Sequence, residues 1–356
     1  MSIQLDDYRL LGRSGLRVSP LSLGTMTFGV GSGWGSTDSD AQHMVDRYIE
    51  LGGNFIDTAN FYASGGSEQL LGQFIQGRRN QLALASKYSL TMQAGDPNAC
   101  GNHRKNMVQS VEASLKRMKT DYLDLLYLHV WDCRTPVEEI LRAFDDLVRA
   151  GKILYAGISD TPAWQISRMQ AIAELRGWTP LVALQIPYNL TERSVEREFM
   201  PMAQEMGLGI LPWSPLAGGV LSGKYSKGDL QNTGETANTQ MNSRKSINIA
   251  TGRLSDKALE IAGVVGGIAA ELNCTSAQVA LAWTLLNPAV VSPIIGARTL
   301  EQFNDNLKAL DVNFSEDQIA KLDTVSKIET CFPHNMMDTP LSNNMFGGVK
   351  IEKRRR

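Results

Sequence analysis

The sequence has few cysteines and no long apolar run. Its four cysteines lie far apart among 356 residues and form no Cys-x-x-Cys pair. This spacing argues against both a zinc site and a disulfide framework, and it fits a reducing compartment. No apolar run approaches the ~20 residues that a bilayer crossing needs, and the N-terminus is acidic where a secretory signal would be basic. We therefore expect a cytoplasmic protein with no metal and no membrane association.

The sequence also lacks a strong net charge, which is only −2. Nucleic-acid binders usually carry a clustered basic face, so this balance does not favour a nucleic-acid partner. The one basic run is the terminal KIEKRRR, which we interpret as a solvated end of a C-terminal tail over residues 331–356. Hydrophobic residues at 43% and charged residues at 20% are typical of an ordinary globular chain. Its length allows one large barrel or two modest domains.

Eight short apolar runs alternate with helical patterns along most of the chain. The runs are nearly continuous rather than alternating, as expected for parallel strands that are buried on both faces. They cover residues 21–25, 55–58, 82–87, 123–129, 155–159, 183–187, 208–214 and 290–296. The sequence therefore predicts eight strands, each followed by a helix.

The clearest predicted helix covers residues 136–150. Thr135 suits its N-cap, Pro136 its first position and Glu138 the capping box, and Gly151 follows the last turn. The same start signal precedes two later helices, at Thr275 with Gln278 and at Ser315 with Gln318.

Eight strand–helix units indicate a closed (β/α)8 TIM barrel, although an open doubly wound sheet has the same local alternation. An open nucleotide-binding sheet should carry Gly-x-Gly-x-x-Gly after its first strand, and the glycines of the first loop have the wrong spacing. We therefore predict a single domain over residues 1–356, with the barrel at about 20–330. An N-terminal β-hairpin at 8–20 is placed to plug the barrel, and a long polar loop after strand seven, 226–253, is interpreted as a flap near the site.

Polar residues stand where several predicted strands end. Asp57, Lys87 and His129 end strands two, three and four, and Tyr62 follows Asp57 in the next turn. Each residue alone is better explained as a cap, a surface group or a packing residue. A barrel, however, directs the C-terminal ends of its strands towards one pocket.

Together these residues suit proton donation. A phenol has a pKa near ~10, which a neighbouring ammonium lowers. Lys87, held by Asp57, would thus prepare Tyr62 to protonate the oxygen of a carbonyl group that accepts a hydride. His129 would donate a hydrogen bond to the same oxygen.

Asp57, Tyr62, Lys87 and His129 resemble the catalytic tetrad of the aldo-keto reductases. The resemblance covers about residues 8–330 through blocks in the same order: GNFIDTANFY, LASK, LYLHVWD, GISD, LQIPYNL, PWSPLAGGVLSGKY and PIIGARTLEQFNDNL. HVWDCRTPVEE with GISDTPAW is most similar to the aryl-alcohol dehydrogenase-type branch. The resemblance implies an NADP-dependent oxidoreductase that reduces aldehydes or ketones and holds its cofactor across the top of the barrel.

The resemblance also implies the cofactor contacts. Ser159, Asp160 and Gln185 would hold the carboxamide, and Trp213 would stack on the nicotinamide ring. Much of the family has Asn at the position of Asp160, and a carboxylate can accept from the carboxamide NH2 but cannot donate to its oxygen. Arg298 is the candidate for the 2′-phosphate and favours NADP over NAD. The other implied cofactor residues are Gly24, Thr25, Ser214, Pro215, Leu216, Gly218, Lys224, Gly296, Ala297, Gln302 and Asn306.

Three aromatic residues that follow strand ends, Phe28, Trp34 and Trp131, are candidates for an apolar substrate cleft. Ordinary packing explains them equally well. If they line the cleft, they suggest an aromatic or bulky carbonyl substrate.

Two other functions stay open at this point. A cofactor-binding module that resembles the potassium-channel β subunits would keep the tetrad but show little turnover with a soluble carbonyl compound. A barrel hydrolase would need a second carboxylate beside Asp57, and no strand end supplies an obvious one. The sequence leaves the natural substrate, the reaction direction and the oligomeric state undetermined.

Overall fold

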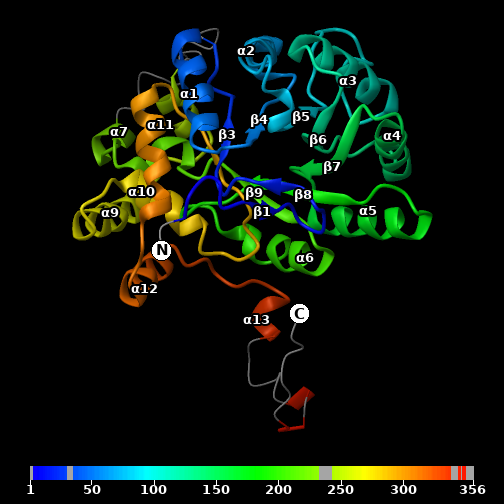
Figure 1. The fold of residues 1–356 in the computed structure, drawn as a ribbon. Helices are drawn as coiled ribbons and strands as arrows, with labels where there is room; N and C mark the ends of the chain where they lie inside the picture. The colour runs from blue at the N-terminus through cyan, green and yellow to red at the C-terminus, as the bar shows by residue number, and fades with distance from the viewer. Residues whose placement is uncertain (1–2, 30–34, 232–242, 338–343, 346, 350–356) are drawn as a thin grey trace.

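The computed structural model describes residues 3–29, 35–231, 243–337, 344–345 and 347–349. Parallel strands surround a central axis, and helices cover them from outside (Figure 1). The barrel strands are β3 (Ser22–Gly24), β4 (Phe55–Asp57), β5 (Ala83–Tyr88), β6 (Leu123–Leu128), β7 (Ile153–Ser159), β8 (Leu181–Pro187), β9 (Gly209–Trp213) and β10 (Ile294–Ile295). Their order is β10-β3-β4-β5-β6-β7-β8-β9.

The sheet closes between β9 and the segment that leads into β10. The backbone N–H of Ile210 donates to the carbonyl of Ala289 at 3.1 Å, and Val291 donates back to Ile210 at 2.8 Å. The predicted barrel is therefore confirmed, and the open doubly wound sheet is excluded. Each of the eight predicted runs overlaps one strand; β5, β7 and β8 extend beyond their predicted runs, and the last run is shortened to the two residues of β10.

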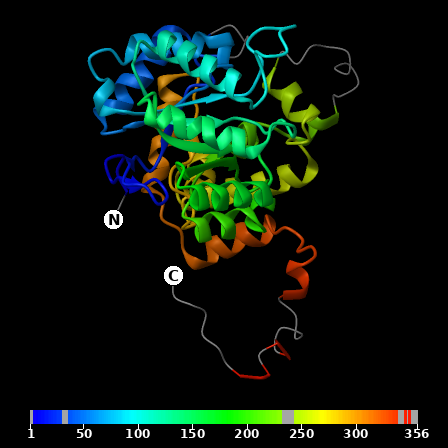
Figure 2. The ribbon, with the colours of Figure 1, turned by 90° about the vertical axis from the view of Figure 1, so that its right-hand side faces the viewer.

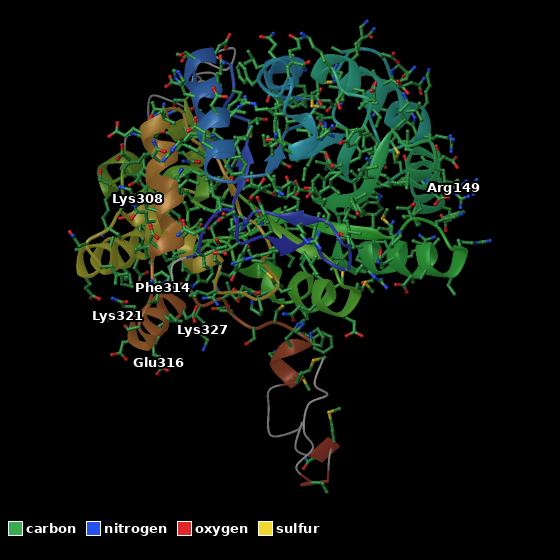
Figure 3. All side chains as sticks on the ribbon, viewed as in Figure 1. Arg149, Lys308, Phe314, Glu316, Lys321 and Lys327 are labelled. Atoms are coloured by element: carbon green, nitrogen blue, oxygen red, sulfur yellow. The ribbon has the colours of Figure 1, made fainter. Side chains whose placement is uncertain are left out.

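The helices pack apolar stripes against the outside of the barrel. In α4 the stripe that includes Ile140, Leu141 and Phe144 is buried, as predicted. Charged side chains such as Arg149 and Lys321 point outward (Figure 3). Besides the short helices given below, the helices are α1 (Asp38–Glu50), α2 (Gly66–Phe74), α3 (Arg104–Met118), α4 (Val137–Arg149), α5 (Ala163–Arg176), α6 (Phe199–Met206), α9 (Asp256–Glu271), α10 (Ser276–Thr284), α11 (Leu300–Leu307) and α12 (Glu316–Val325).

The start of α4 differs from its prediction. The N-cap is Pro136, without a side-chain hydrogen bond, so the predicted capping by Thr135 is wrong. The Thr135 hydroxyl instead donates to Asp132 Oδ2 at 2.7 Å and its backbone N–H donates to Asp132 Oδ1 at 2.9 Å, so Thr135 belongs to the turn that precedes the helix. The two capping boxes predicted for later helices, Thr275 with Gln278 and Ser315 with Gln318, are confirmed.

The N-terminal hairpin plugs the end of the barrel where the strands begin. β1 (Arg9–Leu10) pairs antiparallel with β2 (Arg17–Val18). Leu11 and Val18 are fully buried in the cluster that fills the barrel interior, together with Phe55, the first residue of β4. The predicted hairpin is confirmed, and its apolar residues complete the barrel core.

The segment 226–253 was predicted as a loop, and this is wrong in part. It contains α7 (Lys227–Gln231) and α8 (Arg244–Ala250), while its middle lies outside the described residues. Ser243 caps α8 in a capping box with Ser246. The sequence pattern missed this start because a serine replaces the usual Glu or Gln at the third position.

After α12 the chain leads away from the barrel towards α13 (His334–Met337), as Figures 1 and 2 show. Arg197 donates to the Glu329 carbonyl at 2.5 Å and attaches this segment near α6. Among the described helices no single one meets the length and apolarity of a bilayer span. Only α9 and α10 together meet them, and these two are bent by 103° at the break between them.

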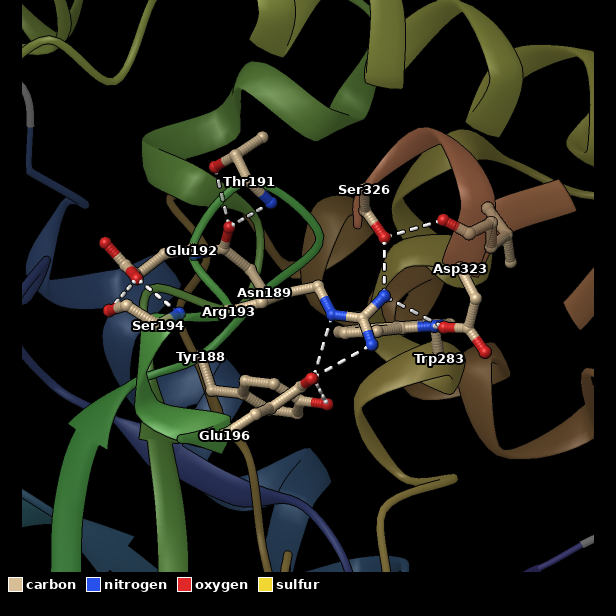
Figure 4. A network of polar contacts seen from close by, with 11 residues as sticks. Tyr188, Asn189, Thr191, Glu192, Arg193, Ser194, Glu196, Trp283, Asp323 and Ser326 are labelled. Carbon is tan, nitrogen blue, oxygen red and sulfur yellow. Dashed lines mark hydrogen bonds and ion pairs between the residues drawn. The ribbon is translucent and has the colours of Figure 1, made fainter. Parts of the chain in front are cut away.

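A polar network ties the loop after β8 to α12 (Figure 4). The Arg193 guanidinium binds the Glu196 carboxylate through two hydrogen bonds of 2.8 and 3.0 Å, and it also reaches Asp323 at 2.9 Å. In the same loop, Asn189 Nδ2 donates to the carbonyl of Ser214 at 3.0 Å. The loop thus connects α12 to the point where the chain leaves β9.

Candidate active site

Three of the four predicted catalytic residues are joined by one ammonium group. Lys87 Nζ donates to Asp57 Oδ1 at 2.5 Å, to the Tyr62 hydroxyl at 3.2 Å and to the Thr58 carbonyl at 2.8 Å. The side chain of Lys87 is 0% exposed and that of Asp57 is 3% exposed. The pair is therefore a buried ion pair that lies against the tyrosine hydroxyl.

The barrel register explains this convergence. Asp57, the last residue of β4, pairs with Ala85 of β5, so Lys87 lies two residues further along on the same face of the sheet. After β4 the chain turns back, and the Tyr62 N–H donates to the Ala59 carbonyl at 3.2 Å, just before the 3₁₀ segment η2 (Tyr62–Gly65). This turn places Tyr62 over the strand ends.

The protonation states follow from burial and from the ion pair. Burial disfavours the Lys87 ammonium, but Asp57 and Tyr62 outweigh it and raise the pKa of Lys87. Burial raises the pKa of Tyr62, and the opposing effect of Lys87 is smaller. The sequence-based expectation of a lowered tyrosine pKa is thus wrong, because desolvation of a phenolate exceeds its attraction to the ammonium. Tyr62 is a neutral hydroxyl that holds a proton to donate.

His129 lies one residue beyond β6 and lines the same cavity. Its backbone N–H donates to the Tyr88 carbonyl at 2.9 Å, and its ring stands edge-on to Tyr62 with centroids 6.1 Å apart. Burial and the charge of Lys87 lower the pKa of His129 to about 3. The ring is therefore neutral near pH 7, with one N–H available as a donor.

Gln185 has a contact that the sequence did not indicate. Its Nε2 donates to Asp57 Oδ2 at 2.8 Å, so each carboxylate oxygen of Asp57 accepts one hydrogen bond. Gln185 therefore supports the tetrad in addition to lining the cavity. Ser159 pairs with Gln185 across β7 and β8, and its buried Oγ has no partner among the described residues.

A cavity of 660 Å³ extends from Tyr62 and His129 along the strand ends to the segment around Arg298. This volume falls in the range of ligand pockets. The structure brings together on its wall all the predicted cofactor residues except Thr25: Gly24, Ser159, Asp160, Gln185, Trp213, Ser214, Pro215, Leu216, Gly218, Lys224, Gly296, Ala297, Arg298, Gln302 and Asn306. Thr25 is buried, and its hydroxyl donates to the Asp57 carbonyl at 3.1 Å, a structural contact behind the cavity wall.

Cations gather on the part of the wall that follows β9. Lys224 and Arg298 were predicted, and Arg244 of α8 joins them on the wall. Burial, together with Arg298 and Arg244, lowers the pKa of Lys224. Guanidinium and ammonium groups are the usual partners of phosphate, so this region suits a phosphate ligand. The sequence missed Arg244 because no local pattern shows that α8 folds back over the strand ends.

The residues present fit a nicotinamide dinucleotide. The buried, unpartnered Ser159 hydroxyl is available to an amide, and the cationic region is available to phosphates. Gly218 has a φ of +66°, and a Cβ there would lie 2.3 Å from Asn248 Oδ1, so only glycine lets this loop approach α8 and the cavity. When bound, such a cofactor would supply a hydride.

Two of the three predicted substrate residues, Phe28 and Trp131, are not on the cavity wall. Phe28 is 1% exposed and belongs to the hydrophobic core. Trp131 packs edge-on against Trp164 with ring centroids 5.8 Å apart, and Trp34 lies outside the described residues. The structure instead lines the catalytic end with three apolar residues that the sequence reasoning missed, namely Met26, Phe61 and Leu90. Loop packing turned Phe28 inward and left its neighbour Met26 41% exposed.

The fold and the site define a (β/α)8-barrel enzyme with a Tyr–Lys–Asp–His arrangement at the strand ends. The sequence profile of the Aldo/keto reductase family matches residues 20–327, and the chain belongs to this family of oxidoreductases. It is 36% identical over 347 residues to norsolorinic acid reductase of Aspergillus flavus, covering 94% of this chain and 84% of that protein. It is 35% identical over 337 residues to aryl-alcohol dehydrogenase (NADP(+)) of Phanerodontia chrysosporium, covering 90% and 86%. An oxidoreductase of Bacillus subtilis is 37% identical over 331 residues, covering 90% and 95%.

Proposed function

We propose that this protein reduces aldehyde or ketone groups to alcohols with NADPH, and that Tyr62 is the proton donor. The observation that carries the proposal is the Lys87 ammonium, which contacts both the Asp57 carboxylate and the Tyr62 hydroxyl beside the cavity. A hydride from the cofactor adds to the carbonyl carbon, and the oxygen takes the Tyr62 proton. The nearby ammonium offsets the negative charge that forms on the tyrosine.

His129 complements this reaction. As a neutral imidazole it donates a hydrogen bond to the carbonyl oxygen without adding a charge that would compete with Lys87. Its edge-on position beside Tyr62 puts both groups at the same end of the cavity. Two donors on one oxygen orient the carbonyl and favour the charge that develops there.

The cationic part of the cavity supports NADP rather than NAD. Lys224, Arg244 and Arg298 offer more positive charge than a pyrophosphate alone requires. A guanidinium suits a phosphate monoester such as the 2′-phosphate. The relative named aryl-alcohol dehydrogenase (NADP(+)) agrees with this assignment. Arg298→Ala should raise KM for NADPH much more than KM for NADH.

The proposed substrates are aromatic or bulky neutral carbonyl compounds. Met26, Phe61 and Leu90 give the catalytic end an apolar wall, and Trp213 adds an indole face. The name of the relative aryl-alcohol dehydrogenase (NADP(+)) also points to aromatic compounds. The four free cysteines suit a reducing compartment, which supports a cytoplasmic location.

The test is the initial rate of NADPH oxidation with a simple aromatic aldehyde, measured beside NADH. Tyr62→Phe should lower kcat by roughly 10²–10⁴-fold and leave NADPH binding nearly unchanged, because only the donated proton is removed. Tyr122→Phe is the matched control, since Tyr122 stacks with Arg79 outside the cavity and should keep the wild-type rate. If the wild type binds NADPH but turns over no carbonyl compound, a binding module replaces this proposal.

A further inference from the structure

Asp160 puts a second carboxylate at the catalytic end of the cavity. It follows β7 directly and lines the cavity together with Tyr62 and His129. Its Oδ1 accepts a hydrogen bond of 3.1 Å from Nε1 of Trp213, at the end of β9. The carboxylate is thereby held across the gap between two strand ends.

Asp160 and Asp57 differ in the partners of their carboxylates. Asp57 forms a buried ion pair with Lys87, whereas the hydrogen-bond donor to Asp160 is a neutral indole. Burial raises the pKa of Asp160, and the charge of Lys87 opposes this without reversing it. The Arg253 guanidinium lies 5.5 Å from the centroid of the Trp213 ring and places a positive charge against the same indole.

The carboxylate lies close enough to act on the reacting groups. Burial is the largest cause of the raised pKa of Tyr62, and the charges of Asp57 and, to a smaller extent, Asp160 add to it, while burial also raises the pKa of Asp160. Hydride transfer needs the reacting atoms about 3–3.5 Å apart, and the carbonyl oxygen must reach the Tyr62 hydroxyl. Any ring that donates a hydride to that carbonyl therefore lies within the field of Asp160.

We propose that Asp160 selectively stabilises the oxidised, positively charged form of the nicotinamide ring. The proposal rests on the proposed function and adds a residue that tunes it. Reduction consumes a carbonyl compound, one NADPH and one proton, and yields an alcohol and NADP+. The ring gains one positive charge as the hydride and its electron pair leave, so a fixed carboxylate favours the oxidised product.

Asp160→Asn tests the charge with little change in shape. The amide oxygen can still accept from Trp213 Nε1, and asparagine tolerates the positive φ of 32° at this position. Dissociation constants of NADP+ and NADPH are measured by titration calorimetry at pH 8 for the purified full chain. The ratio Kd(NADP+)/Kd(NADPH) should rise about five- to tenfold in the variant, as expected for the loss of one nearby charge.

Asp305→Asn is the matched control. Asp305 also lines the cavity but binds Thr275 and Gln278 near the adenosine segment. That part of the cofactor is identical in both redox forms, so this substitution should leave the ratio unchanged. If Asp160→Asn does not fold, as judged by circular dichroism, Asp160→Ser should give the same shift.

Two outcomes would overturn the inference. A ratio that changes less than twofold in a folded Asp160 variant, with both cofactor forms still bound, refutes the role of Asp160 and leaves the proposed function intact. Failure of the wild type to bind either form refutes the proposed function together with this inference.

Discussion

Replacing Lys87 with methionine should destabilise the protein strongly. The substitution removes three hydrogen bonds from Nζ, to Asp57, to the Thr58 carbonyl and to Tyr62. Asp57 would then be buried without its counter-ion, with Gln185 as its remaining side-chain donor. A buried carboxylate without its counter-ion is far more costly than an exposed one.

The expected loss is about 3–5 kcal/mol of the free energy of unfolding, the typical cost of breaking a buried ion pair by removing one partner. This is a large share of the ~5–15 kcal/mol that stabilises an ordinary protein. Adding Asp57→Asn removes the unpaired charge and should recover about 2–3 kcal/mol. Turnover should stay lost in both variants, because neither has an ammonium beside Tyr62.

A double-mutant cycle measures the coupling between Lys87 and Asp57. Urea unfolding gives the free energy of unfolding of the wild type, of Lys87→Met, of Asp57→Asn and of the double variant. Lys257→Met is the matched control, because Lys257 and Glu260 form an ion pair with both side chains 59% exposed. Its cost should be below about 1 kcal/mol. If the losses of the two single variants simply add in the double variant, the buried pair does not couple and the account of Asp57 and Lys87 is wrong.

Two further results are expected. Burial and Lys87 lower the pKa of His129 to about 3 in the folded protein, whereas it is about 6.5 in the unfolded chain. Between pH 3 and 6.5 the unfolded state therefore binds more protons, so the free energy of unfolding should fall as the pH drops through this range. His129→Asn should reduce the slope of this free energy against pH by up to about 1.4 kcal/mol per pH unit in urea titrations, and an unchanged slope contradicts the neutral imidazole. Arg193→Leu should cost about 2–3 kcal/mol by breaking its charged hydrogen bonds to Glu196 and Asp323, measured as a guanidinium midpoint. Lys321→Leu, at an exposed ion pair, is its control, and equal losses in the two would show that the network contributes little.

Local patterns were most reliable where the chemistry is local. The capping boxes at Thr275 and Ser315 form as predicted, because their partners lie three residues away. The prediction failed at Thr135, whose hydroxyl binds a carboxylate in the preceding loop. The two helices within 226–253 were missed because that stretch has no clear apolar period and α8 begins with a serine pair.

The site residues also divide into those that local sequence indicates and those that depend on contacts between distant segments. The sequence indicated Asp57, Lys87 and His129 because strand ends of a barrel converge whatever the loops do. It could not identify Met26, Phe61, Leu90 or Arg244 as wall residues, since their positions depend on how separate loops pack against one another.

The sequence by itself determined the alternation of strands and helices, the barrel and the polar residues at its strand ends. These features depend on periodicity and order along the chain, which are written in the residues. The tertiary structure alone decided that Gln185 binds Asp57, that Phe28 is core and that Tyr62 has a raised pKa. Each of these depends on burial and on contacts between distant segments, because desolvation and Coulomb energies are set by the three-dimensional surroundings of a group.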